Sequence, residues 1–368
     1  MAAAPVKVAI VGVGMSTTVF HAPFILSLPD KFKLSVIVER SATAEKSKAR
    51  DLYPGVKVVN TLDEALKEDI EAVWVLSIND THYEFAKAAL NAGKHAIVEK
   101  PITATSAEAT ELAELAKSKN LVLAVYQNRR WDADYLTVKK LLAEGTFGEL
   151  SEFTSHFDRY KNIPNAKAWK DAPLPGAGAA YDLGSHLIDQ ILDLFGPPQK
   201  VTGLVRNSRT IGHPDVPDSF LIHLHYPASS AAGRSLPLLC TARASILSLQ
   251  TPQPRFVIRG TKATYTKTGV DVQEPQLVKG GADAIKQEGF AVEPETQAGV
   301  LYRVEKPSEP EIVISERGAY GKWFENVAEA LIAKDPSKLI VKPEQAALTI
   351  KIIELAEQSS KEGRTIDL

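Results

Sequence analysis

The chain has 368 residues, of which 44% are apolar and 24% are charged, and its 43 basic and 45 acidic residues give a net charge of −2. A chain of this length is expected to form two domains, each with its own hydrophobic core. The near balance of charge provides no global field for a nucleic acid or an anionic membrane, so small-molecule chemistry is the expected class of function.

Cysteine content and the N-terminus favour the cytoplasm. Cys240 is the only cysteine and cannot form an internal disulfide, and no Cys/His cluster has the spacing of a zinc site, so no metal is expected. Residues 1–5 lack the basic start of a signal peptide, and no run reaches the ~18 apolar residues of a membrane span. We therefore expect a cytoplasmic protein.

The first predicted element is a buried strand that leads into a glycine turn. Residues 6–11 are short, β-branched and nearly all apolar, as is typical of a parallel strand, and Gly12 and Gly14 follow at once. A segment that can be helical then extends to Pro23. Strand, glycine turn and helix start together indicate dinucleotide binding, because glycines let the backbone approach a pyrophosphate at a helix N-terminus. Thr17 replaces the third glycine of this fingerprint, and a plain glycine-rich connection is the alternative.

Two residues directly after the second predicted strand, residues 34–38, favour different cofactors, one NAD and the other NADP. Glu39 stands a little over twenty residues after Gly14, where an acidic side chain accepts hydrogen bonds from the ribose of NAD. Arg40 follows directly, and a guanidinium there could pair with the 2'-phosphate of NADP. The choice between NAD and NADP stays open.

Short apolar strands and amphipathic helices then alternate, which predicts a doubly wound parallel sheet of the Rossmann type over residues 1–127. Ligands of such sheets bind at the carboxyl ends of the strands, so we single out the loops at 77–82, 99–101 and 126–131. The expected elements are strands at 56–59, 72–76, 95–98 and 121–125 and helices at 62–67, 82–92 and 106–118.

Glu99-Lys100-Pro101 is the most informative of these loops. It follows a strand directly, and the proline restricts Lys100 and prevents a helix from starting there. A lysine at this edge can reach a substrate hydroxyl beside a nicotinamide; an unremarkable surface lysine is the alternative.

Residues 128–368 change periodicity and predict an α+β domain with a large, mainly antiparallel sheet. The proline- and glycine-rich loop at 163–178 either covers a substrate or is an ordinary surface connection. Residues 252–303 suggest no chemistry. The expected elements are helices at 133–144 and 343–358 and strands at 150–160, 201–206, 219–226, 236–244, 255–259 and 311–315.

A helix at 178–194 carries polar residues inside an apolar run. Asp182, His186 and Asp189 are spaced four and three residues apart, so they share one face of the helix. Such a stripe indicates a functional site, although a simple Asp182/His186 pair is the alternative. His223 and His225 share a strand face and could suggest a metal pair, but no third ligand is nearby in the sequence.

Three motifs together resemble the Gfo/Idh/MocA family of sugar and polyol dehydrogenases: Gly12-Val-Gly14, Glu99-Lys100-Pro101 and Asp182-Leu-Gly-Ser-His186. The resemblance covers nearly the whole chain. Further stretches resemble a subgroup, the scyllo-inositol dehydrogenases that use NADP, and lie at residues 20–23, 79–83, 127–132, 156–160 and 181–190. Thr17, Gln127 and Glu39 depart from the pattern of that subgroup.

The resemblance implies site residues and a reaction. The implied catalytic residues are Lys100, Asp182 and His186, with His186 as general acid/base, Asp182 binding a hydroxyl and Lys100 binding the reacting oxygen. Cofactor contacts are implied for Gly12, Gly14, Met15, Ser16, Thr17, Glu39, Arg40, Asn79, His82, Glu99 and Lys100. Substrate contacts are implied for Asn128, Arg130, Trp131, Arg159, Tyr160, Asp182 and His186.

The expected function is hydride transfer between NAD or NADP and a CH–OH group of a sugar or inositol-type polyol. The resemblance also implies a homodimer or homotetramer formed through the sheet of the C-terminal domain. The alternative is a regulatory protein of the same fold that binds dinucleotide or sugar without turnover.

Overall fold

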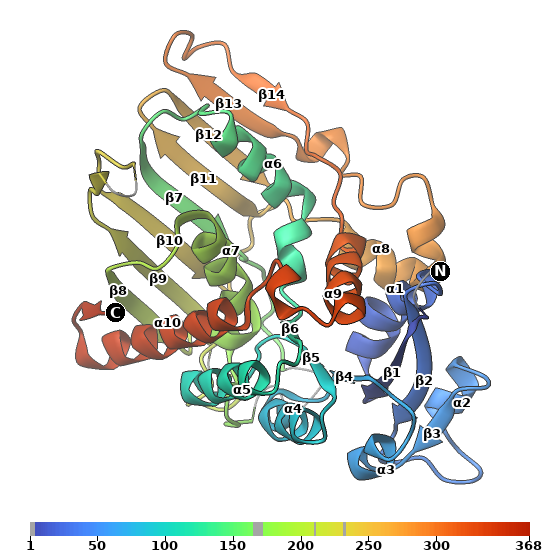
Figure 1. Ribbon diagram of the computed structural model, residues 1–368. Helices are drawn as coiled ribbons and strands as arrows, with labels where there is room; N and C mark the ends of the chain where they lie inside the picture. Colours follow the sequence, from blue (N-terminus) through green and yellow to red (C-terminus); the bar gives the residue numbers. More distant parts are fainter. Residues whose placement is uncertain (1–3, 165–171, 210, 231–232) are drawn as a thin grey trace. The chain divides into compact units, whose positions relative to one another are not determined.

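The computed structural model describes residues 4–164, 172–209, 211–230 and 233–368 (Figure 1). The chain divides into two compact units. Unit 1 comprises Met1–Asn128, Gln273–Phe290 and Ala319–Ala347; unit 2 comprises Arg129–Val272, Ala291–Gly318 and Leu348–Leu368. Within the described residues, no helix has both the length and the apolar character that crossing a membrane requires.

Unit 1 contains a six-stranded parallel sheet in the order β3-β2-β1-β4-β5-β6, the order of a doubly wound Rossmann sheet. The predicted fold class is confirmed. All residues of β4 and β5 are buried, which explains their nearly continuous apolar sequences. The strands are β1 (Val6–Val11), β2 (Phe32–Val38), β3 (Lys57–Val59), β4 (Ala72–Val75), β5 (His95–Val98) and β6 (Leu123–Val125).

Two helices of unit 1 begin with a capping box that has the sequence pattern Thr-x-x-Glu. The hydroxyls of Thr61 and Thr105 accept from the backbone N–H of Glu64 and Glu108, whose carboxylates bond back to the threonine N–H groups. The helices of this unit are α1 (Ala22–Ser27), α2 (Lys48–Leu52), α3 (Leu62–Leu66), α4 (His82–Asn91), α5 (Ser106–Ser118), α8 (Gln273–Gly280) and α9 (Gly321–Ala333).

Helices α8 and α9 were not predicted in this unit, because α8 lies between β12 and β13 of the second sheet in the sequence and α9 follows β14. The division at residue 127 therefore differs from the observed one. Packing explains the difference: Trp323 of α9 donates to the carbonyl of Val125 at 3.1 Å, and Phe324 stacks on Phe24 with ring centroids 4.8 Å apart. A late segment thus completes the core of the early sheet.

Unit 2 contains a nine-stranded sheet in the order β14-β13-β12-β11-β7-β10-β9-β8-β15, antiparallel except for the β7/β10 pair. Its predicted antiparallel character is confirmed, and residues 252–303 contribute two strands that were not predicted, β12 and β13. The strands are β7 (Leu150–His156), β8 (Lys200–Arg206), β9 (Ser219–Tyr226), β10 (Leu238–Ala244), β11 (Pro254–Gly260), β12 (Ala263–Thr268), β13 (Gly299–Arg303), β14 (Glu311–Val313) and β15 (Ile366–Asp367).

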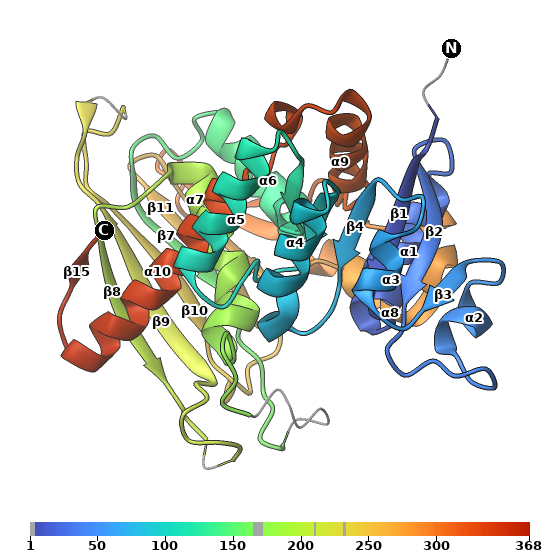
Figure 2. The same cartoon turned by 60° about the horizontal axis from the view of Figure 1, so that its bottom comes forward.

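Helices α6 (Ala133–Ala143), α7 (Ser185–Phe195) and the unit 2 part of α10 (Pro343–Glu362) lie on one face of this sheet (Figures 1 and 2). Close approach is possible because Gly203 of β8 has no side chain: a Cβ there would collide with the Ala356 carbonyl of α10. Ser359 accepts from the Gly203 N–H at 2.9 Å. Successive side chains along each strand point to opposite faces of the sheet. These helices cover and bury one face, and no described helix covers the other.

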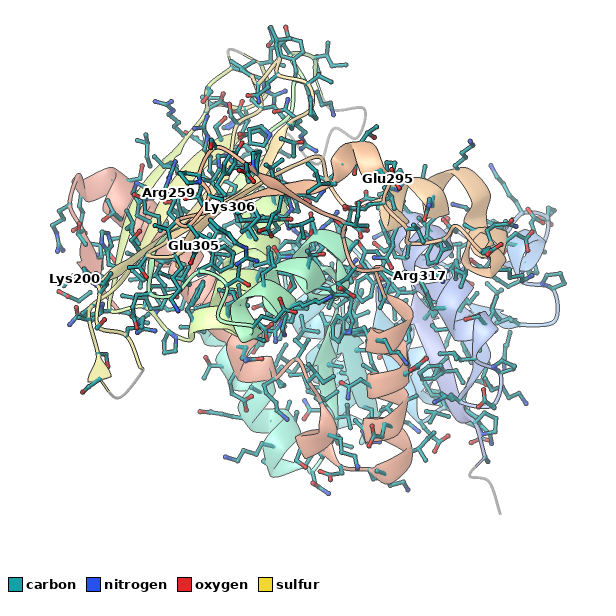
Figure 3. All side chains as sticks on the ribbon, turned by 90° about the horizontal axis from the view of Figure 1, so that it is seen from above. Lys200, Arg259, Glu295, Glu305, Lys306 and Arg317 are labelled. Atoms are coloured by element: carbon teal, nitrogen blue, oxygen red, sulfur yellow. The ribbon has the colours of Figure 1, made fainter. Side chains whose placement is uncertain are left out.

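The uncovered face carries charged side chains in register. Cross-strand partners place Lys200, His225, Leu239, Glu152 and Arg259 in one row across five strands. Arg259 and Glu152 form an ion pair whose side chains are about half exposed, and Figure 3 labels Lys200 and Arg259. This face is polar enough to meet solvent.

Candidate functional site

The glycine turn after β1 requires glycine. Gly12 has φ of +102°, and a Cβ on it would lie 3.0 Å from the carbonyl oxygen of Leu76, just after β4. A Cβ on Gly14 would meet no other part of the described chain within 4 Å, and both Gly14 and Met15 are exposed. Because the strand order reverses between β1 and β4, this turn lies at the switch point where Rossmann sheets bind ligands.

Thr17 supports the same turn from inside the protein. Its side chain is fully buried and its hydroxyl donates to the Gly12 carbonyl at 2.8 Å. It belongs to a π-helical segment, Ser16–His21, which runs into α1. The predicted end of the helix at Pro23 is wrong, because Pro23 occupies the first turn of α1, where a missing N–H costs nothing.

Glu39 lies at the end of β2 and binds the N-terminus of α2. Its carboxylate accepts from the Ser47 hydroxyl at 2.6 Å and from the backbone N–H groups of Lys48 and Ala49, each at 3.0 Å. Burial tends to raise the pKa of Glu39, but these hydrogen bonds and the charge of Arg50 hold it below its ordinary value. Arg40 is exposed beside it. The carboxylate that was predicted to bind the ribose therefore already accepts hydrogen bonds from other residues of the protein.

Two more predicted cofactor residues follow β4. Asn79 opens a 3₁₀ turn, Asn79–Thr81, and is partly exposed. The His82 ring is fully buried, with Nδ1 2.8 Å from the carbonyl oxygen of Pro101 and Nε2 3.3 Å from that of Ser77. Burial lowers the pKa of His82, so the neutral ring donates one hydrogen bond, which the shorter distance assigns to Pro101. His82 therefore supports the loop after β5 from within.

Glu99 and Lys100 begin that loop. One Glu99 oxygen lies 3.1 Å from Nε2 of His21, and the other accepts from the Lys100 backbone N–H at 2.9 Å. Glu99 is buried, whereas Lys100 is partly exposed. Sequence reasoning gave no role to His21; its place in the stretch Phe20-His-Ala-Pro23 was the only signal.

These residues of unit 1 converge on one edge of the sheet. Gly12, Glu39, Asn79 and Glu99 follow the parallel strands β1, β2, β4 and β5, so all of them stand at the carboxyl edge. The same edge therefore carries a turn in which a Cβ at Gly12 would be crowded and a partly exposed lysine, Lys100.

The predicted polar helix of unit 2 starts in a second π-helical segment, Ala180–Gly184, and continues as α7. Single π-helical turns occur often at functional sites. Asp182 is partly exposed in this segment, while His186 is 5% exposed and meets the Phe157 ring edge-on with centroids 6.4 Å apart. Gly184 allows close packing, since a Cβ on it would lie 3.3 Å from the ring of Phe220.

Asp189 lies on the same helix as Asp182 and His186 but binds an arginine. Its two oxygens accept from Nη2 and Nε of Arg130 at 2.7 and 2.8 Å, and Nη1 of Arg130 donates to Asp193 at 2.8 Å. Burial acts to lower the pKa of Arg130, but the charges of Asp189 and Asp193 raise it. Arg130 is 3% exposed, and its guanidinium fixes α7 through these bonds; its implied substrate contact stays a prediction.

Arg255 is a second buried arginine, and sequence reasoning missed it. It is fully buried and donates to Asp134 at 2.7 Å, to Ser155 at 2.7 Å and to Gln190 of α7 at 2.9 Å. The pairing of β11 is irregular between Pro254 and Phe256, so simple alternation along the strand does not reveal its burial.

Other implied substrate residues differ in accessibility. Asn128 and Trp131 are buried, at 5% and 8% exposure. Arg159 and Tyr160 are exposed after β7, where the backbone of Arg159 pairs with Ser245 at 2.9 Å. The loop at 163–178 lies partly outside the described residues.

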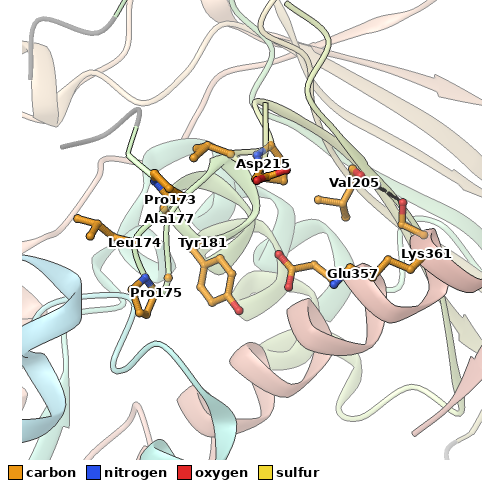
Figure 4. Close-up of a pocket in the computed structure, with 13 residues that line it drawn as sticks. Pro173, Leu174, Pro175, Ala177, Tyr181, Val205, Asp215, Glu357 and Lys361 are labelled. Atoms are coloured by element: carbon orange, nitrogen blue, oxygen red, sulfur yellow. Dashed lines mark hydrogen bonds between the residues drawn. The ribbon is translucent and has the colours of Figure 1, made fainter. Parts of the chain in front are cut away.

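A cavity of about 620 Å³ lies in unit 2 beside the start of the polar helix (Figure 4). Its walls combine apolar residues of 173–177 and 215–217 with Tyr181, Glu357 and Lys361. Burial, together with the charges of Glu357 and Glu354, raises the pKa of Tyr181, so its hydroxyl stays protonated. The cavity therefore combines apolar surface with the hydroxyl of Tyr181 and the carboxylate of Glu357. Tyr181 directly precedes Asp182 in the chain.

Comparison with known proteins identifies both parts of the chain. Residues 6–127 match the profile of the oxidoreductase family's NAD-binding Rossmann fold (GFO_IDH_MocA), and residues 139–368 match the profile of the family's C-terminal alpha/beta domain. The uncharacterized oxidoreductase C115.03 of Schizosaccharomyces pombe is 42% identical over 99% of this chain and all of that protein.

A curated sequence and a solved structure, both from Bacillus subtilis, are similar to this chain over nearly their whole lengths. The scyllo-inositol 2-dehydrogenase (NADP(+)) IolW of Bacillus subtilis is 34% identical over 99% of this chain and 96% of that protein. The solved structure of yvaA from Bacillus subtilis has a TM-score of 0.87 at 33% identity and covers 100% of this chain and 99% of its own.

Proposed function

Because the chain belongs to the Gfo/Idh/MocA family of oxidoreductases, we propose that it is an NAD(P)-dependent dehydrogenase acting on a CH–OH group of a sugar or inositol-type polyol. The observation that carries the proposal is the carboxyl edge of the unit 1 sheet. There, a turn that excludes any Cβ at Gly12 stands on the same edge as a lysine with a fixed backbone. The similarity to a scyllo-inositol dehydrogenase supports the class of substrate.

The residues present fit a dinucleotide. The Gly12 backbone approaches Leu76 so closely that a side chain at Gly12 would be crowded, and a Cβ on Gly14 would meet no described residue within 4 Å. Such a turn binds a pyrophosphate through N–H groups. When bound, the nicotinamide supplies hydride acceptance and donation.

The protein's own residues then move a proton and orient the substrate. His186 is the general acid/base, since an imidazole titrates near working pH, and such proton transfer is worth roughly 10²- to 10⁴-fold in rate. Asp182 binds a substrate hydroxyl. Lys100 donates a hydrogen bond to the reacting oxygen, where its charge stabilises a developing alkoxide.

The cofactor proposed is NADP. Glu39 supports this choice because its carboxylate is bound by the N-terminus of α2, which offsets its negative charge, while the exposed Arg40 can pair with a 2'-phosphate. The NADP-using relative points the same way.

The proposed assembly is a homodimer or homotetramer built on the uncovered face of the nine-stranded sheet. In the centre of the row Leu239 lies between His225 and Glu152, so a second copy in the reverse direction would place each His225 opposite a Glu152 and the two leucines together. Light scattering of the purified protein gives the mass directly.

Absorbance at 340 nm with a panel of polyols and sugars, under NAD and NADP in turn, tests the proposal. Lys100→Met and His186→Asn serve as matched variants that should bind dinucleotide but turn over orders of magnitude more slowly. Tight dinucleotide binding without turnover by the wild type would instead indicate a regulatory protein.

A further inference from the structure

Lys100 lies between two residues that buried histidines hold in place. His21, at the end of the π-helical segment, bonds to the side chain of Glu99, and His82, at the start of α4, bonds to the carbonyl of Pro101. Both histidine side chains are fully buried. The backbone on each side of the lysine is thus fixed, while its side chain remains partly exposed.

Glu99 links His21 to Lys100 by hydrogen bonds. Its two carboxylate oxygens have separate partners, Nε2 of His21 at 3.1 Å and the Lys100 N–H at 2.9 Å. Burial tends to raise the pKa of Glu99, but the hydrogen bond from His21 and the charge of Lys100 hold it below its ordinary value. An ionised carboxylate only accepts hydrogen bonds, so Nε2 of His21 carries the hydrogen.

Aromatic rings fix the orientation of the His21 ring. Its centroid lies 4.1 Å from that of Tyr126, 5.6 Å from that of Phe324 and 6.1 Å from that of Trp323. Among the described residues, Nδ1 of His21 has no hydrogen-bond partner, which suits a bare acceptor nitrogen facing aromatic rings better than a buried N–H. The imidazole can therefore neither rotate freely nor reach solvent.

Packing alone does not explain a histidine at this place. An apolar side chain would fill the aromatic surroundings, and a buried polar pair is often no more stable than apolar residues of similar volume. The polar pair does, however, set the direction of the Glu99 carboxylate, and that carboxylate binds the lysine backbone.

We propose that His21 is a positioning residue for Lys100, acting through Glu99 to fix the lysine at the carboxyl edge of the sheet. The proposal rests on the proposed function for the catalytic role of Lys100. His21 itself is too deeply buried to touch substrate.

Two variants of His21 separate the hydrogen bond from packing. His21→Phe fills the space but removes the donor, whereas His21→Gln retains an N–H donor at comparable reach. We expect His21→Phe to lower kcat about 10- to 100-fold, the scale of a misplaced catalytic group, with the Kd of dinucleotide unchanged. His21→Gln should recover most of the loss.

The matched control for stability is Phe32→Leu. Phe32 starts β2, at the opposite end from Glu39, and packs edge-on against Trp74 with centroids 5.4 Å apart. This variant should lose stability and keep the wild-type kcat. A double variant with Lys100→Met completes the cycle: His21→Phe should add no further loss once the lysine is gone. An equal loss in both backgrounds would overturn the proposal.

An activity-independent readout keeps this test separate from the proposed function. Reductive methylation with ¹³C-formaldehyde gives each lysine an NMR signal, and the signal missing in Lys100→Arg belongs to Lys100. We expect that signal to shift or broaden in His21→Phe and to stay unchanged in Phe32→Leu. An unchanged Lys100 signal in folded His21→Phe would refute the positioning role, whether or not the wild type turns over any sugar.

Discussion

The two units position their functional residues by different means. In unit 1, the turn at Gly12 and the loop at Lys100 follow buried apolar strands and are held by backbone geometry and single hydrogen bonds. In unit 2, the polar helix is held by two buried guanidinium groups, Arg130 and Arg255, which bind carboxylates and Gln190. Apolar packing is enough to position functional residues that directly follow the strands of a sheet. A helix that lies on a sheet needs directional hydrogen bonds to fix its rotation about its axis.

The largest expected effect comes from breaking the buried network of unit 2. Arg255→Met should lower the free energy of unfolding by about 3–5 kcal/mol, because Asp134 is left buried without its partner. Urea denaturation followed by circular dichroism measures the loss. Arg259→Met is the control, since its exposed pair with Glu152 is worth about 0–1 kcal/mol. Equal losses for the two variants would mean that the buried arginine contributes no more than a surface one.

Unit 1 should respond to backbone strain instead. Gly12→Ala forces a Cβ into a positive-φ residue 3.0 Å from the Leu76 carbonyl, at a cost of about 1–3 kcal/mol, and should also weaken dinucleotide binding. Thermal unfolding and fluorescence titration with NADPH measure the two effects. Gly14→Ala meets no neighbour among the described residues and should leave stability unchanged. If Gly14→Ala destabilised unit 1 as much, the close approach at Gly12 would not be the cause.

Protonation should affect the two units in opposite directions. Burial raises the pKa of Asp132 in unit 2, and the charges of Asp271 and Asp134 add to the effect against that of Arg129; the pKa of Glu99 in unit 1 is lowered. A carboxyl with a raised folded pKa binds its proton more tightly when folded, so its contribution to stability falls as pH rises above the unfolded value of about 4. Glu99 contributes stability that is lost as pH falls through its folded pKa.

Replacing each of the two carboxylates by its amide tests these opposite pH dependences of stability. The expected changes in the free energy of unfolding are smaller than those of the variants above. Asp132→Asn should gain stability relative to the wild type as pH rises from about 4 to 7, and Glu99→Gln should lose relative stability as pH rises toward about 4.5. Unfolding free energies across this range provide the comparison. The same slope for both variants would contradict the assigned environments.

The difference between the units also decided what could be predicted from sequence. Continuous apolar strands and an amphipathic helix pattern made β1, β5 and α5 predictable to the residue. Helix α9 was missed because its partners, Val125 and Phe24, lie about 200 and 300 residues earlier in the chain. The capping role of Glu39 depended on the short helix α2, which no periodicity revealed.

Buried charged side chains were the other reason why part of the site could not be predicted from the sequence. Arg130 stood in a motif associated with substrate and Asp189 in a polar stripe with His186, and only the structure shows that they bind each other at 2.7 Å. A sequence gives the spacing of charged groups along one helix but not the partner that another element supplies. Lys100, Asp182 and His186 were identifiable because their motifs together resemble a known family, and their catalytic roles stay predictions.

The pH dependence of oxidation by the wild type and His186→Asn tests the central claim most directly. If His186 accepts the hydroxyl proton, kcat/KM for oxidation should rise with pH until the imidazole is neutral, and reduction should show the opposite limb. His186→Asn should be slower by roughly 10²- to 10⁴-fold and should lose that limb, because an amide cannot carry the proton. A variant that kept the wild-type limb would assign proton transfer to another group and leave His186 with a structural role.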